Sequence, residues 1–207
     1  ITAIGSFSAD IVIKKCRENG MRVIGCDIYP REWVVDAGNV DAFYQVPRAT
    51  EAEAYPEALL SICSREKVDG ILPLTDVEVD VLCRLRGEFA GRGITLCISA
   101  DACIGLCRDK MKLFCRLEEE RRRLEEMEFM LSTQTLFGVK PEALSYPVVC
   151  KPYNGRSSQG LTFIGSLREM ERFLEGRDVS DYIVQPLVTG DVITVDVVRN
   201  AADGAWA

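Results

Sequence analysis

The sequence predicts an α/β protein, with a mainly parallel sheet in its first part and an α+β arrangement in its last part. Three observations support this. Short apolar runs alternate with amphipathic helical patterns over the first hundred residues, a charged helical stretch follows, and strand-like runs return after residue 132. Strands that alternate with helices need crossover connections, and these produce a parallel sheet covered on both faces.

The elements of the first part follow from apolar periodicity and from helix stop signals. Residues 9–19 are expected to form a helix because Gly20 follows them, and glycine adopts the left-handed conformation that ends many helices. A second helix is expected at 56–67, where the apolar positions Ala58, Leu59, Ile62 and Cys63 share one face. A third is expected at 77–91, and strands are expected at 1–4, 21–28, 42–46, 70–74 and 95–98.

The stretch 100–127 has a helical pattern. Leu113, Phe114, Leu117, Leu124 and Met127 form an apolar stripe. The run 118–123 places opposite charges three and four residues apart, which indicates a solvated face rather than a binding patch. After residue 132 the sequence predicts strands at 146–151 and 161–164, then a helix, a strand that starts at residue 182, and another strand that continues to residue 198.

Composition argues against nucleic-acid and membrane partners. The net charge is −7, there is no long basic run, and no apolar run approaches the ~20 residues of a membrane-spanning helix. Nine cysteines are present, an odd number without a Cys-x-x-Cys motif. We therefore expect reduced thiols and a cytoplasmic protein.

Histidine is absent from these residues, which excludes Ser-His and Cys-His nucleophilic pairs within them. Cys103 and Cys107 are four residues apart on an expected helix, with Cys115 downstream, so a zinc site is conceivable. Because no histidine completes that ligand set, we do not favour it and expect no metal ligands in this chain.

Two features of the first part resemble binding motifs. Gly5 follows the first strand and Asp27 closes the second, as in a dinucleotide-binding unit. Phe7 stands where a second glycine is needed, so a structural α/β unit is favoured over a nicotinamide site. Asp76 and Glu78 follow an expected strand end and could line a substrate cleft, although acids there are often only helix N-terminal residues.

The strand that ends at Lys151 is the most informative feature of the last part. It reads Pro-Val-Val-Cys-Lys-Pro over residues 147–152, and a loop of small residues follows at 154–160. An ammonium beside a side-chain-poor loop is how proteins neutralise and contact a polyphosphate. A hairpin connection would favour Asn-Gly in a two-residue turn, whereas this loop spaces two glycines five residues apart. We therefore interpret it as a phosphate lid.

These segments carry a resemblance to a known family. The pair Asp109-Lys110 comes first, the lysine-bearing strand and its glycine-containing loop follow, and Val184-Gln185 leads to Gly190. In this order they resemble the ATP-grasp ligases. The preceding hundred residues resemble the α/β domain of the carbamoyl-phosphate-synthase-large-chain-like and biotin-carboxylase-like members. The resemblance covers nearly all of the chain.

The resemblance implies a fold for each part and a nucleotide site. It implies a Rossmann-like pre-ATP-grasp domain at 1–107, linking helices at 108–132 and an α+β ATP-grasp small lobe at 133–207. Lys110 and Lys151 match the two lysines that approach the ATP phosphates. The family's lid over the phosphates corresponds to Ser157, Ser158, Gln159 and Gly160. The hinge against which adenine stacks corresponds to Gln185, Pro186, Leu187 and Val188. Asp191 could replace the glutamate that the family usually has at the position of Val192.

The implied activity is an ATP-dependent ligation of a small carboxylate with an amine or similar nucleophile, through an acyl phosphate. The implied cofactors are ATP and Mg²⁺, with the Mg²⁺ ligands expected in the second half of the family fold, beyond residue 207. We therefore expect these 207 residues alone not to turn over. Exposed apolar positions expected on the first domain would suit a homodimer.

A different class of protein is the alternative. The family usually has glutamate where this chain has Pro186, and again where it has Val192. Those acids commonly serve the ribose or the adenine amino group. Their absence favours a non-catalytic nucleotide-binding or scaffold protein with a degenerate site.

Overall fold

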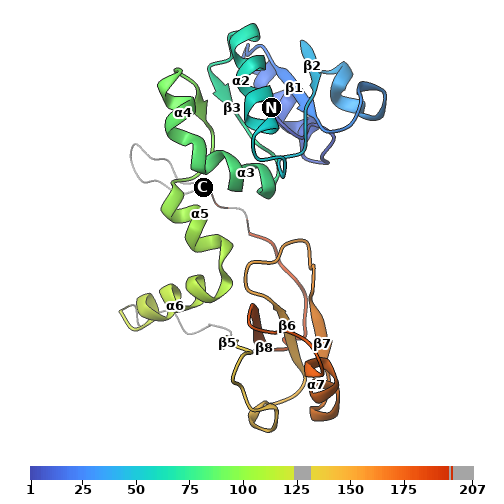
Figure 1. Cartoon of the computed structure of the whole chain (residues 1–207), viewed down its shortest axis with the longest axis vertical. Helices are drawn as coiled ribbons and strands as arrows, with labels where there is room; N and C mark the ends of the chain where they lie inside the picture. The colour runs from blue at the N-terminus through green and yellow to red at the C-terminus, as the bar shows by residue number, and fades with distance from the viewer. Residues whose placement is uncertain (124–131, 196, 198–207) are drawn as a thin grey trace. The chain divides into compact units, whose positions relative to one another are not determined.

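The computed structural model describes residues 1–123, 132–195 and 197, and it divides into a first unit, residues 1–105, and a second unit, residues 106–207 (Figure 1). The first unit combines parallel strands with helices, and the second combines an antiparallel sheet with helices. The expected mixed α/β class is therefore confirmed. Within the described ranges, no helix has the length and apolar character needed to cross a membrane.

Parallel pairing organises the first unit. Strand β1 (Ile24–Asp27) pairs with β2 (Ala42–Gln45), and β3 (Gly70–Ile71) pairs with β4 (Thr95–Leu96). The segment 1–4 lies between the two pairs. The amide of Cys26 donates to the carbonyl oxygen of Ile1 (3.0 Å), and the amide of Thr2 donates to that of Leu72 (3.2 Å). The hydrogen-bonded order is therefore β2, β1, segment 1–4, β3 and β4.

Segment 1–4 is not a regular strand, which corrects the expectation for it. Ala3 has a φ of 50°, in the left-handed region that an alanine adopts only at a cost. The amide of Ile4 nevertheless donates to the carbonyl oxygen of Cys26 (3.2 Å), and Ile4 is fully buried. The segment keeps its place in the sheet although its backbone departs from strand geometry.

Helix α1 (Ala9–Glu18) ends as its sequence predicts. Gly20 has a φ of 73°, and its amide donates to the carbonyl oxygen of Arg17 (2.9 Å). The amide of Met21 donates to the carbonyl oxygen of Cys16 (3.0 Å), which completes a Schellman motif. The remaining helices of this unit are η1 (Arg31–Trp33), η2 (Val35–Gly38), α2 (Ala54–Glu66), α3 (Asp76–Leu82), η3 (Cys83–Leu85) and α4 (Arg86–Gly91).

The single helix expected at 77–91 is wrong, because the chain tightens into the 3₁₀ turn η3 between α3 and α4. Leu85 leaves the helical region, with φ −105° and ψ 8°. On either side of this break, Leu82 and Phe89 are both fully buried in the same core cluster. The sequence pattern predicted one helix over 77–91 and could not show that the helix is interrupted.

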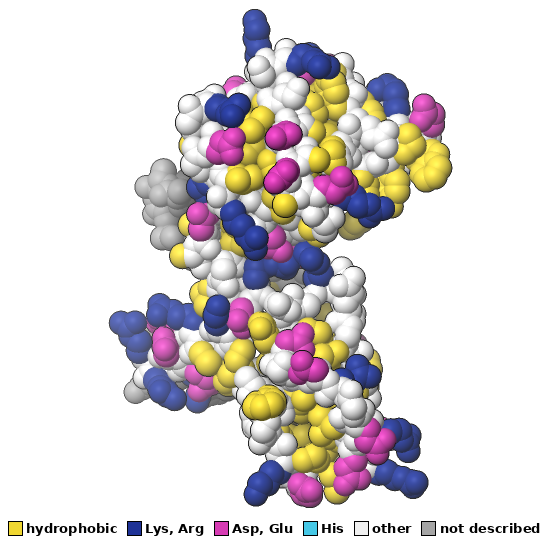
Figure 2. Space-filling model, viewed as in Figure 1, with side chains coloured by type: hydrophobic (Ala, Val, Ile, Leu, Met, Phe, Trp, Pro, Cys, Tyr) yellow, Lys and Arg dark blue, Asp and Glu magenta, His cyan; other side chains and the backbone are white. Residues whose placement is uncertain are grey.

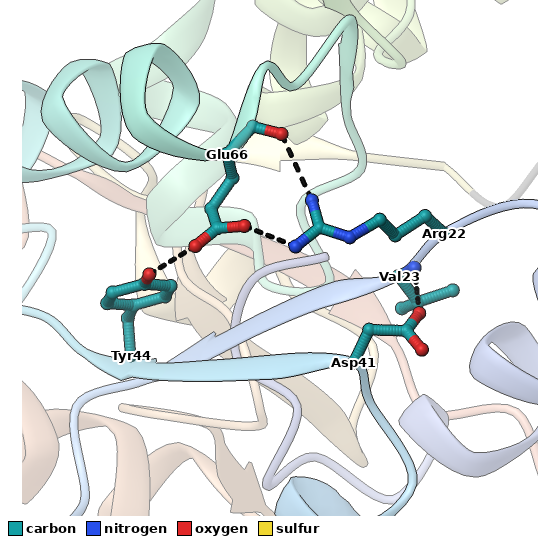
Figure 3. A network of polar contacts seen from close by, with 5 residues as sticks. All are labelled: Arg22, Val23, Asp41, Tyr44 and Glu66. Atoms are coloured by element: carbon teal, nitrogen blue, oxygen red, sulfur yellow. Dashed lines mark hydrogen bonds and ion pairs between the residues drawn. The ribbon is translucent and has the colours of Figure 1, made fainter.

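A polar network ties the first strands to the end of α2 (Figure 3). The Glu66 carboxylate accepts hydrogen bonds from the Tyr44 hydroxyl and from the Arg22 guanidinium, which also donates to the Glu66 carbonyl oxygen (3.1 Å). These two hydrogen bonds to the carboxylate hold the pKa of Glu66 below its ordinary value. The Asp41 carboxylate accepts from the amide of Val23 (2.7 Å), just before β1. The network fixes how β1, β2 and α2 meet.

The second unit contains a four-stranded antiparallel sheet in the order β5, β8, β6, β7. Its hydrophobic core lies on one face, where Met170 of α7 joins Val148 and Cys150 of β6 and Val184 of β8. The strands and helices of this unit are α6 (Lys110–Arg121), β5 (Gln134–Thr135), η4 (Pro141–Ala143), β6 (Val148–Pro152), β7 (Thr162–Ile164), α7 (Leu167–Leu174) and β8 (Tyr182–Pro186); α5 (Asp101–Arg108) contains the division between the units.

Helix α6 carries intermixed charges, as Figure 2 shows. Arg121 pairs with Glu118 (3.0 Å), and Arg116 pairs with Glu119 (3.6 Å) and Glu120 (2.5 Å), all within one turn along the helix. These pairs confirm the solvated face predicted from residues 118–123. The last two apolar positions of the predicted stripe, Leu124 and Met127, lie outside the described residues.

The strand expected to continue to residue 198 does not form in the described part of that segment, residues 191–195 and 197. Val192 is 95 % exposed and Ile193 is 82 % exposed, and the backbone forms no strand there. A strand is stable only when its backbone pairs and one of its faces is buried. The sequence has strand propensity at this place, but the described residues give it no partner.

Burial of the cysteines generates a prediction about thiol labelling. Burial raises the pKa of Cys26 to about 12 and that of Cys150 to about 11, so neither thiol supplies much of the reactive thiolate. Iodoacetamide at about pH 8 should modify Cys97, Cys103, Cys107 and Cys115, which are exposed, well before Cys26, Cys63 and Cys150. Peptide mass mapping of the native protein, with the urea-unfolded protein as control, measures this order. Equal labelling of Cys150 and Cys115 in the native protein would contradict it.

Candidate functional site

Lys151 lies at the end of β6, with its side chain on the sheet face opposite to the hydrophobic core. Side chains alternate between faces along a strand, so Val148 and Cys150 point into the core while Val149 and Lys151 point to the other face. Lys151 pairs with Ile183 of β8. Cys150, the residue before Lys151, is fully buried. Its burial fixes the position of the strand that carries the lysine.

Gln185 lies on the same face as Lys151. It pairs with Val149 across the antiparallel ladder, and residues directly opposite each other point to one face. Its amide nitrogen donates to the hydroxyl of Thr133 (2.7 Å), which orients the side chain. The sheet thus brings together two of the predicted site residues, about 7 Å apart along the strand direction.

Lys110 is the first residue of α6, and it is joined to the loop that follows β6. Its backbone amide donates to the carbonyl oxygen of Tyr153 (2.8 Å). Its ammonium donates to the carbonyl oxygen of Gly155 (2.6 Å) and to that of Tyr153 (3.3 Å). Asp109 caps the helix by accepting from the amides of Met111 and Lys112, both at 3.0 Å.

The electrostatics of this corner favour an anion. Burial, Lys151 and Arg108 together hold the pKa of Lys110 below its ordinary value, and Asp109 only partly offsets them. Burial likewise lowers the pKa of Lys151. The cost of holding cationic groups close together falls when a bound anion neutralises them.

Arg108 is a residue that the sequence reasoning missed. It ends α5, two residues before Lys110, and its charge acts on the Lys110 ammonium. The signal was present in the sequence as a basic residue next to the Asp-Lys pair. It falls within the helical pattern expected over residues 100–127, and that pattern gave no reason to single it out.

The loop 153–161 packs on a platform formed by Pro152 and Tyr182. A Cβ atom placed on Gly160 would lie 2.9 Å from Pro152 Cγ and 2.9 Å from Tyr182 Oη, and Gly160 has a φ of 71°. A Cβ atom on Gly155 would lie 3.2 Å from Pro152 Cβ. Both glycines therefore allow the loop backbone to approach the end of β6 closely.

The tip of the loop is a tight turn centred on two serines. Ser157 has a φ of 47° and Ser158 a φ of 56°, and the amide of Gln159 donates to the carbonyl oxygen of Arg156 (2.9 Å). Positive φ at both central residues defines a type I′ turn. This differs from the expectation that the loop contains no two-residue turn, because serine adopts a geometry that Asn-Gly usually provides.

Backbone conformations of this kind cost energy and persist only where the surrounding structure imposes them. Ser157, Ser158, Gln159 and Gly160 are all exposed. The polar groups of the turn therefore face solvent, where a ligand could reach them.

The predicted hinge, residues 185–188, begins in the last two residues of β8 and continues past the end of the strand. Pro186 pairs with Val148, and the amide of Leu187 donates to the carbonyl oxygen of Pro147 (3.0 Å). Val188 is 70 % exposed. Asp191 is exposed and lies beyond the sheet, so no contact described for it brings it to the lysines.

In the first unit, the Gly5 and Asp27 pair has a structural role. The Asp27 carboxylate accepts from the amide of Gly5 (2.7 Å) and from the amide of Tyr29 (3.0 Å), and the residue is 4 % exposed. An acid that is used in this way by its own backbone is not available to a ribose hydroxyl. The structural interpretation of this pair is therefore favoured over a nicotinamide site.

Glu78 lies in the first turn of α3, as the helix N-terminal interpretation expects, and its carboxylate is buried rather than open to a cleft. It is 6 % exposed, and its carboxylate accepts from the hydroxyls of Tyr55 (2.8 Å) and Thr75 (2.8 Å). Burial and the nearby Glu78 carboxylate strongly raise the pKa of Tyr55, so this hydroxyl stays protonated and donates. Asp76, in contrast, is exposed at the first residue of α3.

Within the described ranges, no three Cys, Asp or Glu side chains gather as a metal ion would require. Cys103, Cys107 and Cys115 are exposed and form no such group.

Comparisons with known proteins concern the first unit and the fold. Residues 6–97 match the family model described as PylC-like, N-terminal domain. Among curated proteins, no sequence matches the chain.

The solved structures that are similar in fold include the following three. An L-amino acid ligase from Bacillus licheniformis is 16 % identical, with a TM-score of 0.63 over 87 % of this chain and 41 % of that one. Biotin carboxylase from Campylobacter jejuni, solved as a β,γ-ATP complex, is 16 % identical, with a TM-score of 0.61 over 86 % and 42 %. N5-carboxyaminoimidazole ribonucleotide synthetase from Thermotoga maritima is 15 % identical, with a TM-score of 0.60 over 100 % and 49 %. The chain spans less than half the length of each.

The packing of Gly160 generates a prediction about stability. Gly160→Ala adds a Cβ atom to a left-handed residue and also brings it against Pro152 and Tyr182. Gly176→Ala is the matched control, because Gly176 has a φ of 64° but no atom within 4 Å of the added Cβ. Both variants should lose about 1–2 kcal/mol of unfolding free energy from the backbone. Gly160→Ala should lose about 1–3 kcal/mol more from overpacking, measured by urea denaturation. Equal losses in the two variants would show that the platform is not tightly packed.

Proposed function

We propose that the second unit of this chain binds ATP for a carboxylate–amine ligase, and the fold, which is that of the N-terminal region of the ATP-grasp superfamily, supports this proposal. In this proposal the ligase is carbamoyl-phosphate-synthase-like: ATP phosphorylates a small carboxylate, and an amine or similar nucleophile captures the acyl phosphate. The supporting likeness is to solved ligases and carboxylases that are under 25 % identical, so the activity rests on the site itself.

One observation carries the proposal: two lysines from separate elements meet at the base of one glycine-containing loop. Lys110 contacts the loop through the carbonyl oxygen of Gly155, and Lys151 ends the strand from which the loop starts. Lys151 lowers the pKa of Lys110, so the two charges act on each other. Such an arrangement suits a ligand with several negative charges close together.

The residues present fit a nucleoside triphosphate. The ammonium groups of Lys110 and Lys151 would hold its phosphates, and the amides and hydroxyls of Ser157 and Ser158 would cover them and exclude water. The segment 185–188 would carry the adenine, beside the edge of the sheet. Mg²⁺, when bound with ATP, would neutralise charge on the phosphates.

We extend the proposal to the first unit. The hydrogen-bonded order of β2, β1, segment 1–4, β3 and β4 matches the first five positions of a Rossmann-like sheet, which supports a pre-ATP-grasp domain over 1–107. Under the same proposal, residues 108–132 link it to the small lobe at 133–207.

The proposed partners are small molecules. The protein would act in the cytoplasm, without nucleic-acid or membrane partners. A homodimer would use the apolar surface over η1 and η2, where Trp33 is 74 % exposed (Figure 2).

A specific observation favours the second candidate, a scaffold or nucleotide-binding protein without catalysis. Pro186 is exposed at the hinge and offers no carboxylate, and Asp191 has no described contact with the lysines. If Pro186 and Asp191 decide the affinity for nucleotide, the protein keeps the fold but does not bind ATP.

Binding of ATP separates the proposed nucleotide site from a scaffold that binds no nucleotide. We expect a fluorescent ATP analogue to bind the chain, and Lys151→Met to weaken it about 10- to 100-fold, because a charge-assisted contact to phosphate is lost. Lys140→Met, an exposed lysine of the same unit, is the matched control and should bind like the unchanged protein. Fluorescence titration measures the three dissociation constants. The same affinity in both variants, or no binding at all, would favour the scaffold.

The lysine pKa values predict a pH dependence for this binding. Burial holds the pKa of Lys151 below its ordinary value of 10.5, and the cationic form is the one that binds phosphate. Affinity should therefore fall as the pH rises, and the fall should begin at a lower pH than for an exposed lysine. In Lys151→Arg the charge persists, so the fall should be smaller. Identical pH profiles for the two proteins would remove Lys151 from the phosphate contact.

A further inference from the structure

The ammonium of Lys110 donates hydrogen bonds to the backbone of the loop. Of its three N–H donors, one points to the carbonyl oxygen of Gly155 at 2.6 Å and another to that of Tyr153 at 3.3 Å. The backbone amide of the same residue donates to Tyr153 as well (2.8 Å). The first residue of α6 therefore contacts the first half of the loop by three hydrogen bonds.

The position of Lys110 at the start of α6 makes these contacts firm. Asp109 caps α6 with two hydrogen bonds at 3.0 Å, so the backbone that carries Lys110 is fixed by the helix. Asp109 does not accept from Lys110, and the ammonium is partly removed from water, which lowers its pKa. A cation in such a place gains most from short contacts with carbonyl oxygens.

The other end of the loop is held by packing rather than by charge. Gly160 lies against Pro152 and Tyr182, and the loop passes from there into β7. Between the two attachments stands the turn at Ser157 and Ser158, whose left-handed backbone needs support from its surroundings. Loss of either attachment should release this turn.

We propose that Lys110 is a positioning residue that fixes the conformation of the loop 153–160 before a ligand arrives. This role deepens the proposed function, on which it rests, because a preformed loop lowers the entropic cost of enclosing phosphates. The cation that would contact the ligand thus also shapes the loop that would cover it. A single substitution of Lys110 then affects the ligand-free protein, which a residue that only contacts phosphate would not do.

Trypsin cleavage after Arg156 tests the proposal without any ligand. Arg156 is half-buried and directly precedes the serine turn. In Lys110→Met the side chain keeps its length but loses its donors, and cleavage at this bond should become about tenfold faster. Lys112→Met is the matched control, because Lys112 is two residues away, its side chain is 71 % exposed, and the ion pair described for it is with Asp109 (3.7 Å). It should be cleaved like the unchanged protein.

Two further measurements distinguish the loss of the loop contact from a general loss of folding. Lys110→Arg, which can still donate to carbonyl oxygens, should restore slow cleavage, and far-ultraviolet circular dichroism should be the same for all variants. Hydrogen exchange at the amide of Gln159, which donates to Arg156 in the turn, should be faster only in Lys110→Met.

The proposal is overturned if Lys110→Met and the unchanged protein are cleaved after Arg156 at the same rate. That result is independent of the ATP titration with Lys151→Met, since no nucleotide is added here. Faster cleavage together with absent ATP binding would support the anchoring role and refute the nucleotide site. Unchanged cleavage together with ATP binding would do the opposite.

Discussion

The second unit depends on the alternation of side chains along one strand. Cys150 of β6 is fully buried in the core with Val148, and the next residue, Lys151, must therefore point to the opposite face. A slip of one residue in the pairing of β6 would place the ammonium in this hydrophobic core and the thiol on the opposite face. The burial of Val148, Cys150 and Val184 thus fixes the register, and the register fixes where the positive charge stands relative to Gln185 and the loop.

The loop and helix α6 then complete the arrangement by different means. Gly155 and Gly160 let the loop pack on Pro152 because they have no side chains. Lys110, in contrast, holds the loop through its charge and its hydrogen bonds. In the first unit the comparable loop after segment 1–4 is fixed by the Asp27 carboxylate, which accepts from the amide of Gly5. Both units therefore stabilise a loop at a strand end by a charged side chain from another element, but only in the second unit is that charge positive and close to a second cation.

Local pattern predicted the strand with Lys151, the loop glycines, the pairing of charges on α6 and the end of α1 at Gly20. These features depend on neighbours along the chain. The sequence could not predict the burial of Glu78, because its partner Tyr55 is 23 residues away. Nor could it predict the interruption at Leu85 or the left-handed Ala3 and Ser157, since tertiary packing overrides local preference there. Arg108 was missed because its effect on Lys110 is spatial.

The exposed segment that follows β8 has a consequence for the protein in solution. The stretch contains Val192, Ile193 and Val195, which are β-branched and 75–95 % exposed, and its backbone pairs with no strand in the described part of the chain. Unpaired backbone with high β propensity is the kind of surface on which copies of one chain add to each other as intermolecular sheet. At the concentrations used in purification, these valines and the isoleucine would make the protein prone to aggregate, and a lysine at Val192 or Ile193 would act as a gatekeeper against it.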